Sequence, residues 1–183
     1  MSYSGVAAAM CLLVAVGTVR GQDSPETDRP SATPCADTDA YSEFDFWLGS
    51  WTVHLADGTE VGKNVINKEK GGYAVVERWT SSRGNTGVSL NYYHPEANEW
   101  VQHWVGGDGS LITIRGGMNS GSMILEGTIH YVGRDQTNAL RGTWTPLDDG
   151  RVRQYFEEST DGGATWTEWF EGFYTRMVAT ESR

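Results

Sequence analysis

Nine turn signals at regular intervals constrain the fold of this chain more than any other sequence feature. Between them, residues 44–177 divide into about ten short stretches in which apolar and polar residues alternate, as in half-buried strands. The signals are ADG at 56–58, KGG at 70–72, RGN at 83–85, PEAN at 95–98, GDG at 107–109, NSG at 119–121, GRD at 133–135, DDG at 148–150 and DGG at 161–163. Strands joined by such short turns are antiparallel.

A meander of about ten antiparallel strands is expected to curl and close, because closure removes the unpaired edges of its first and last strands. The sequence therefore predicts an all-β fold, a closed antiparallel barrel. A barrel of this size encloses space that its own side chains do not have to fill. The alternative architecture is a β-sandwich, which would normally have longer connections between its strands.

The N-terminal part of the chain differs from the strand region. Residues 5–19 are apolar or small and too few to cross a bilayer comfortably, and small or apolar residues lie at the −3 and −1 positions before Gln22. Residues 1–21 therefore predict a signal peptide, with an uncleaved anchor as the alternative. We expect a secreted or periplasmic protein, without an integral membrane span after cleavage.

The next segment, residues 22–40, has three of the five prolines and no large apolar side chain, which is typical of a disordered linker. The barrel is expected over 41–178 and a C-terminal tail over 179–183. Cleavage would leave Cys35 as the one cysteine, so we expect a free or intermolecular thiol there. The formal net charge of −10 argues against nucleic-acid binding, because phosphate affinity depends on Lys and Arg.

The structured region opens with FDFWLGSW at 44–51, whose apolar residues have helical spacing up to Trp51. This motif resembles the Gly-x-Trp signature that opens lipocalins and related barrels. The resemblance implies that Trp51 plugs the base of the barrel while a cation from the last strand packs over it. Arg176 is such a cation, at the end of FEGFYTR. We expect both residues to be structural, in a cation–π contact.

Two further segments extend the resemblance, SLNYYHPEANEWVQHW at 89–104 and TWTPLDDGRVRQYFEESTDGGATW at 143–166. With the opening motif, the chain resembles a bacterial family of lipocalin-like domains of unknown function over nearly the whole domain. The resemblance implies a barrel like those of lipocalins and fatty-acid-binding proteins, and it implies no reaction. Nitrobindin-like haem barrels are more distant, and their ligand motif matches no histidine here.

Candidate ligand-binding residues come from strand faces that mix aromatic rings with amides, as small-molecule pockets do. In the two strands around 89–104, one face has Ser89, Asn91 and Tyr93 with Trp100, Gln102 and Trp104. The opposite face, with Val88, Leu90 and Tyr92, is the alternative, since a shift of one residue exchanges the two faces.

Glu77 shares a face with Val75 and Trp79, and a buried carboxylate needs a partner. We expect Arg141 to pair with Glu77 or to hold a ligand carboxylate. Gln154 and Tyr174 complete the expected pocket. A solvated outer face is the alternative for Glu77, Arg141 and Gln154.

The remaining patterns predict neither a metal site nor a cofactor. The histidines, which have no spacing that would place them on one metal, are His54, His94, His103 and His130. No nucleophile elbow or phosphate-binding glycine loop is found.

One stretch, STDGGATW at 159–166, matches the Asp-box of sialidases. It occurs once and lies between expected strands at 152–158 and 166–176. We therefore interpret it as a hairpin in which Asp161 binds the turn backbone and Trp166 packs against the start of the last strand.

The functional hypothesis is a lipocalin-like barrel that binds a small, partly apolar molecule. The first alternative is an enzyme on the same barrel, with Glu77 as a buried general base assisted by Arg141 or Tyr93. The second is a scaffold that acts through its outer surface. The sequence leaves the ligand and the oligomeric state open.

Overall fold

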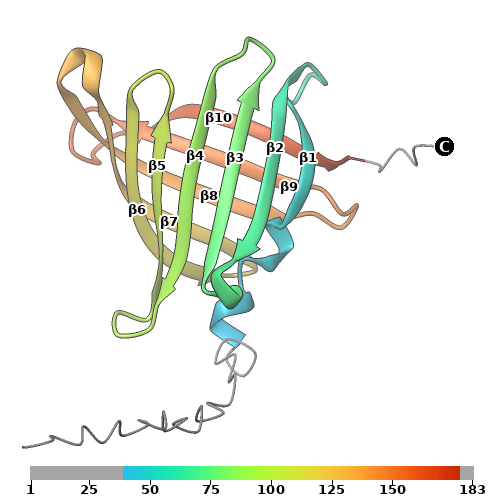
Figure 1. Ribbon diagram of the computed structural model, residues 1–183. Helices are drawn as coiled ribbons and strands as arrows, with labels where there is room; N and C mark the ends of the chain where they lie inside the picture. The colour runs from blue at the N-terminus through green and yellow to red at the C-terminus, as the bar shows by residue number, and fades with distance from the viewer. Residues whose placement is uncertain (1–38, 178–183) are drawn as a thin grey trace, which may run out of the picture. The chain divides into compact units, whose positions relative to one another are not determined.

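The computed structural model describes residues 39–177, which form a closed barrel of ten antiparallel strands. Each strand pairs with the next in the chain, and β1 pairs with β10 to close the sheet (Figure 1). The strands are β1 Gly49–His54, β2 Glu60–Glu69, β3 Ala74–Ser81, β4 Thr86–His94, β5 Glu99–Gly106, β6 Ser110–Asn119, β7 Ser122–Tyr131, β8 Gln136–Pro146, β9 Val152–Ser159 and β10 Thr167–Arg176. The predicted fold class is confirmed, and all nine turn signals fall at connections between strands.

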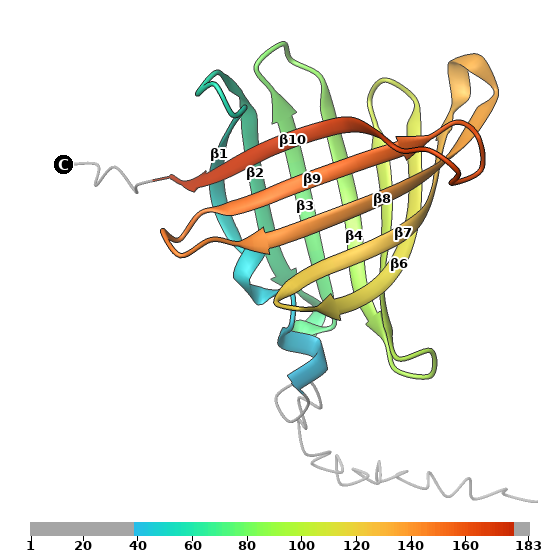
Figure 2. The ribbon, with the colours of Figure 1, turned by 180° about the vertical axis from the view of Figure 1, so that it is seen from behind.

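The strands are strongly tilted, so that β8, β9 and β10 cross over β2–β5 when the barrel is seen from behind (Figure 2). Burial alternates along most strands. In β6, for example, Ser110, Ile112 and Ile114 are buried, whereas Leu111 and Thr113 are exposed. This period of two is the pattern from which the strands were predicted.

The predictions for residues 1–38 and 178–183 lie outside the described residues; they include the signal peptide, Cys35 and the C-terminal tail. The described structure begins with a 3-10 helix, η2 (Asp39–Ser42), followed by a second, η3 (Asp45–Trp47). Asp39 and Ala40, which we had assigned to the linker, therefore belong to the ordered domain.

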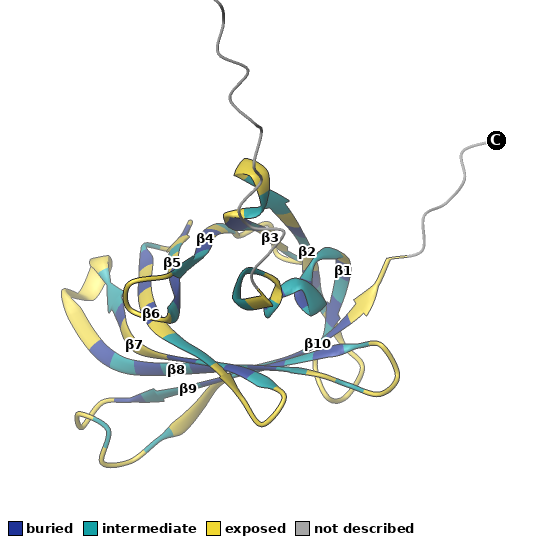
Figure 3. Cartoon of the chain, turned by 90° about the horizontal axis from the view of Figure 1, so that it is seen from below, coloured by how far each residue is buried: buried dark blue, intermediate teal, exposed yellow. Residues whose placement is uncertain are grey.

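These two short helices cover one end of the barrel, which we call the helical end. Seen from that end, they lie across the ring of strands (Figure 3). Phe44 and Trp47 are fully buried and stack on each other with ring centroids 4.9 Å apart. Phe44 also meets Trp100 of β5 and Trp144 of β8 edge to face. The segment before β1 therefore fills this end with aromatic side chains.

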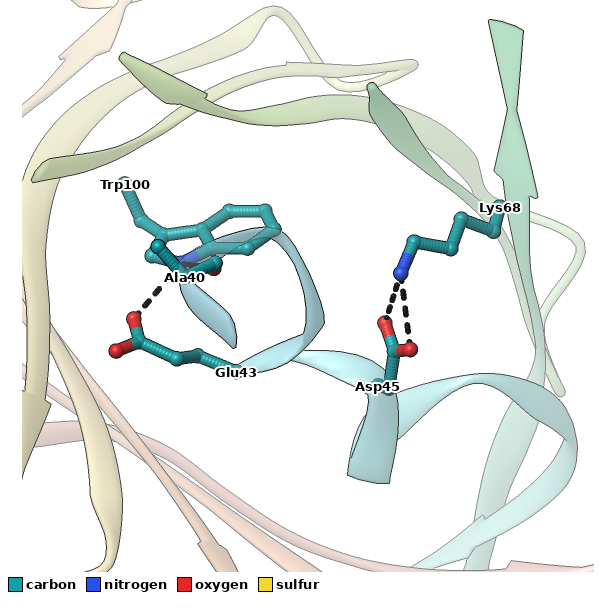
Figure 4. Close-up of polar contacts among 5 residues, drawn as sticks. All are labelled: Ala40, Glu43, Asp45, Lys68 and Trp100. Atoms are coloured by element: carbon teal, nitrogen blue, oxygen red, sulfur yellow. Dashed lines mark hydrogen bonds and ion pairs between the residues drawn. The ribbon is translucent and has the colours of Figure 1, made fainter. Parts of the chain in front are cut away.

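Polar contacts fasten the same segment to the strands (Figure 4). The indole Nε1 of Trp100 donates to the carbonyl oxygen of Ala40 and to Glu43 Oε2, each at 3.2 Å. Lys68 of β2 binds both carboxylate oxygens of Asp45, at 2.7 and 2.9 Å. The helical end is thus held by packing and by hydrogen bonds.

The predicted contact between Trp51 and Arg176 is confirmed at this end. The two residues are directly paired between β1 and β10, and the Arg176 guanidinium carbon lies 4.4 Å from the Trp51 ring centroid. Trp51 is fully buried and donates through Nε1 to the carbonyl oxygen of Trp47 at 2.9 Å. Arg176 donates to the carbonyl oxygen of Leu48 at 3.1 Å. The pair therefore anchors the chain where the helices enter the barrel.

The Asp-box stretch forms the hairpin between β9 and β10. Asp161 Oδ1 accepts from the backbone nitrogen of Thr165 at 2.9 Å and from Ser159 Oγ at 2.7 Å. These hydrogen bonds lower the pKa of Asp161 to about 2, and the largest contribution comes from the Thr165 backbone N–H. Gly162 and Gly163 have φ of 74° and 96°, which a tight reversal favours in glycine. The geometry accounts for the motif as a turn.

Candidate functional site

The mixed aromatic and amide face of β4 and β5 points into the barrel. Ser89, Asn91 and Gln102 are at most 2% exposed, whereas Val88 and Leu90 are each 45% exposed. The predicted phase of these two strands is therefore confirmed.

A cavity of about 210 Å³ lies in the barrel. It is lined in part by the β3–β4 and β5–β6 turns, which are at the end opposite the helices (Figure 1); we call this the open end of the barrel. The rim of the cavity comes from these turns, with Asn85, Thr86, Gly106, Asp108 and Ser110. Its walls are mainly aromatic, with Trp79, Trp104, Ile112, Phe156, Trp169 and Phe170. Its floor is polar and buried, with Glu77, Gln102, Gln154 and Tyr174.

Side-chain hydrogen bonds organise one half of this floor around Glu77. Gln102 Nε2 donates to Asn91 Oδ1 at 2.7 Å, and Asn91 Nδ2 donates to Ser89 Oγ at 2.9 Å. Ser89 Oγ then donates to Glu77 Oε2 at 2.7 Å. A continuous chain of hydrogen bonds thus runs from β5 through β4 to the carboxylate on β3.

The other half of the floor reaches Glu77 from the opposite side. Asn64 Nδ2 on β2 donates to Glu77 Oε1 at 2.6 Å and to Tyr174 Oη at 3.3 Å. Tyr174 Oη in turn donates to Gln154 Oε1. Seven side chains from six strands therefore form one network, and Glu77 is its one carboxylate.

Glu77 is 4% exposed and has no cationic partner among the described residues. Burial raises its pKa to about 7, although the hydrogen bonds from Asn64 and Ser89 oppose this shift. The floor of the cavity therefore has a carboxyl group that changes its charge near neutral pH.

The expected pairing of Glu77 with Arg141 is wrong. Arg141 lies between Leu140 and Gly142, which face the interior, so the alternation of β8 directs Arg141 outward. There its Nε donates to Glu157 Oε2 at 2.7 Å, and its guanidinium carbon lies 4.3 Å from the Trp166 ring centroid. Trp166 comes directly before β10 and packs under this arginine on the outer surface.

Tyr93 also lies away from the cavity, although it shares a strand face with Asn91. Its hydroxyl donates to Asn98 Oδ1 at 2.6 Å, and its ring packs edge to face against Tyr41 at 5.2 Å. Each step of two residues moves a side chain about 6.6 Å along a strand, so one face spans both ends of the barrel. Asn91 itself lies behind Gln102 and supports the floor without lining the cavity.

Of the other predicted residues, Glu77, Gln102, Trp104, Gln154 and Tyr174 line one cavity. Residues outside that predicted set also take part, among them Asn64 in the network and Asp108 and Trp169 around the cavity. Alternation along β2, where Gly62, Asn64 and Ile66 share a face, was the signal that could have placed Asn64 inside. Asp108 lies in a turn, where alternation gives no direction.

Close approach at two glycines keeps the aromatic walls flat. A Cβ atom at Gly87 would clash with the ring of Trp104, and one at Gly142 would clash with the ring of Phe156. Both rings therefore lie directly against the backbone of a neighbouring strand. The space that side chains at these positions would have taken is used by the wall, and the centre of the cavity stays open.

Within residues 39–177, no group of three or more His, Cys, Asp and Glu side chains could hold a metal ion. The helices of this part of the chain are too short or too polar to cross a membrane. No protein-family model matches the chain, and the comparison with curated proteins also finds no match. The resemblance to lipocalin-like domains stays a prediction from the sequence motifs.

Proposed function

We propose that this protein binds a small, partly apolar molecule in the cavity at the open end of the barrel. The observation that carries the proposal is an open cavity with a hydrogen-bonded polar floor and unused polar groups. Gln102 Oε1 and Gln154 Nε2 have no hydrogen-bond partner among residues 39–177, although both side chains line the cavity. Pockets that orient ligands combine apolar walls with a few such polar groups.

The cavity volume limits the size of the ligand. About 210 Å³ is more than the roughly 150 Å³ that accommodates benzene in an engineered protein cavity. It is less than the roughly 300–1,000 Å³ of pockets for drug-sized molecules. A compound with one or two rings, or a short branched chain, fits this range.

A matched pair of substitutions tests the proposal. Ile112 is 4% exposed and lines the cavity, whereas the adjacent Leu111 is 39% exposed and faces outward. Ile112→Trp should fill the cavity, and Leu111→Trp should leave it unchanged. Protein produced from the full chain in several hosts would be examined by native mass spectrometry and by tryptophan fluorescence against a ligand panel.

The expected result is a small molecule that binds the wild type and Leu111→Trp and is lost from folded Ile112→Trp. If repeated preparations contain no compound and no member of a broad panel changes the fluorescence, the binding function is wrong. Retained binding in folded Ile112→Trp would also contradict it, because the ligand would then bind elsewhere.

An enzyme on the same barrel is the second candidate, favoured by one observation. Glu77 is a buried carboxyl beside an open cavity, with a pKa of about 7 and no cationic partner in the described structure. A general base is most effective when its pKa lies near the working pH. If the bound compound is converted during incubation and Glu77→Gln binds it without conversion, the protein is an enzyme; an unchanged compound supports binding alone.

The proposed location is outside the cytoplasm, in the periplasm or the secreted fraction. Its support is the apolar run at 5–19 and the expected cleavage before Gln22. N-terminal sequencing of the protein from separated cell fractions tests both points. The third hypothesis, function through the outer surface alone, gains no support from an open cavity.

A further inference from the structure

The charges around the cavity have one sign. Its lining includes the carboxyl groups of Glu77 and Asp108 and no Lys, Arg or His. Hydrogen bonds from Ser110 lower the pKa of Asp108, so this group is ionised at neutral pH. The neighbouring arginines Arg141 and Arg153 lie on the outer surface, paired with Glu157 and Glu171. A ligand in the cavity therefore meets negative charge that no cation of the lining neutralises.

The walls reinforce this preference. Three indole rings, of Trp79, Trp104 and Trp169, and two phenyl rings, of Phe156 and Phe170, surround the space above Glu77. The faces of aromatic rings carry partial negative charge and attract organic cations, with tryptophan the strongest. Aromatic cages that bind ammonium groups in other proteins use this interaction.

The free polar groups of the floor are mostly acceptors. The Glu77 carboxylate can accept further hydrogen bonds, and Gln102 Oε1 is a free acceptor beside it. Gln154 Nε2 is an unused amide donor, and Gln102 Nε2 has a second N–H beyond the one that binds Asn91. The matching ligand therefore presents N–H donors to the adjacent acceptors, the Glu77 carboxylate and Gln102 Oε1.

We infer that the cavity selects a small organic cation, an ammonium or amidinium group on a flat apolar body, whose N–H groups bind Glu77 and Gln102. This inference rests on the proposed function and names its ligand class. The cationic group lies on the floor beside Glu77 and Gln102, and the apolar body lies between the indole rings.

Titration of Glu77 gives the inference a second readout. The groups that face Glu77 from β2 and β4 are the neutral Asn64 and Ser89, and those from β5 and β9 are the neutral Gln102 and Gln154. From β10 it meets Tyr174, whose pKa is raised well above 10 by burial, and at the rim Asp108 remains ionised. Glu77 is therefore the group of this cavity that changes charge around pH 7, and cation affinity should rise between pH 6 and pH 8.

Three probes of one shape and different charge test the inference: benzylammonium, benzyl alcohol and benzoate. Calorimetric titration at pH 8 should show benzylammonium binding at least ten times tighter than benzyl alcohol, with benzoate weakest. In Glu77→Gln this preference should fall below about threefold, and the rise in affinity between pH 6 and pH 8 should vanish. Glu126→Gln, which removes one exposed carboxylate from the outside of β7, is the matched control and should behave as the wild type.

Equal binding of benzyl alcohol, tighter binding of benzoate, or an unchanged preference in folded Glu77→Gln would each overturn the cation class. These results would leave the proposed function intact, since a compound would still occupy the cavity. Absence of binding by all three probes would also overturn the inference, whereas the Ile112→Trp comparison decides the proposed function separately. If Glu77→Gln does not fold, the ranking of the three probes and the pH dependence of benzylammonium binding, both measured on the wild type, still decide whether the cavity selects a cation.

Discussion

At the helical end of the barrel, Trp47, Trp51 and Trp144 are fully buried, whereas at the open end Trp104 and Trp169 line a cavity and Trp169 is 38% exposed. Both ends consist of strands of the same sheet and use the same side chain. They differ in what covers them, because residues 39–48 fold over the helical end, whereas the part of the chain that the structure describes places turns at the open end (Figure 1). A covered end can use tryptophan for stability, and an uncovered end leaves its tryptophans available to a ligand.

The largest difference in stability between the two ends should appear when one tryptophan at each end is replaced by alanine. Trp51→Ala should lower the free energy of unfolding by about 3–5 kcal/mol, because a fully buried ring and its cation–π contact are lost. Trp169→Ala should cost about 1 kcal/mol or less, because its ring is already partly exposed. Chemical denaturation of both variants measures the difference, and equal losses would contradict this view of the two ends.

On the polar floor of the cavity, a substitution should increase the free energy of unfolding instead of lowering it. The raised pKa of Glu77 means that the native state binds a proton more tightly than the unfolded state, so stability falls as pH rises from about 4.5 to about 7. The shift corresponds to about 3 kcal/mol. Glu77→Gln should therefore be more stable than the wild type by up to about 3 kcal/mol at pH 8 and equally stable near pH 4.

Unfolding curves of both proteins across this pH range provide the measurement. A constant difference between the two proteins at all pH values would show that Glu77 has the same pKa in the folded and the unfolded state, and so that burial does not raise it.

A smaller effect is expected where the cavity wall lies on glycine. Gly87→Ala should destabilise the protein by about 1–3 kcal/mol and weaken ligand binding, since the added Cβ displaces the Trp104 ring. Gly133→Ala is the matched control, because a Cβ there meets no atom within 4 Å, and it should change stability by less than about 0.5 kcal/mol. Thermal unfolding and Trp104-dependent fluorescence follow both effects; unchanged binding in Gly87→Ala would show that the cavity tolerates a moved ring.

The smallest effect is expected at the hairpin between β9 and β10. Asp161→Ala should lower the melting temperature at pH 7, because the turn loses the acceptor for Thr165 and Ser159. Its pKa of about 2 lies below the usual value of 3.8, so its contribution is present above pH 4 and is lost as pH falls through 2. The difference in melting temperature should shrink accordingly, and ligand affinity should stay the same. Loss of binding in folded Asp161→Ala would make this turn part of the site.

Local patterns were sufficient to predict the barrel, because turn chemistry and side-chain alternation act over a few residues. They placed ten strands and the inward face of β4 and β5, and the resemblance to lipocalins added the pair of Trp51 with Arg176. The expected pairing of Arg141 with Glu77 was wrong because it relied on opposite charge, although the alternation of Leu140, Gly142 and Trp144 directs Arg141 outward. We also missed Asn64, whose two acceptors come from β3 and β10.

The sequence by itself determined that this chain forms a closed β-meander with polar residues on inward faces, since these features follow from short-range periodicity and turn chemistry. Only the tertiary structure decided which inward residues meet at one depth, because strand tilt and register set the height of each side chain in the barrel. That height separates Tyr93 at the helical end from Gln102 at the cavity, although both belong to one predicted face. It also brings Glu77 into a network without a cation, which gives this barrel its candidate site.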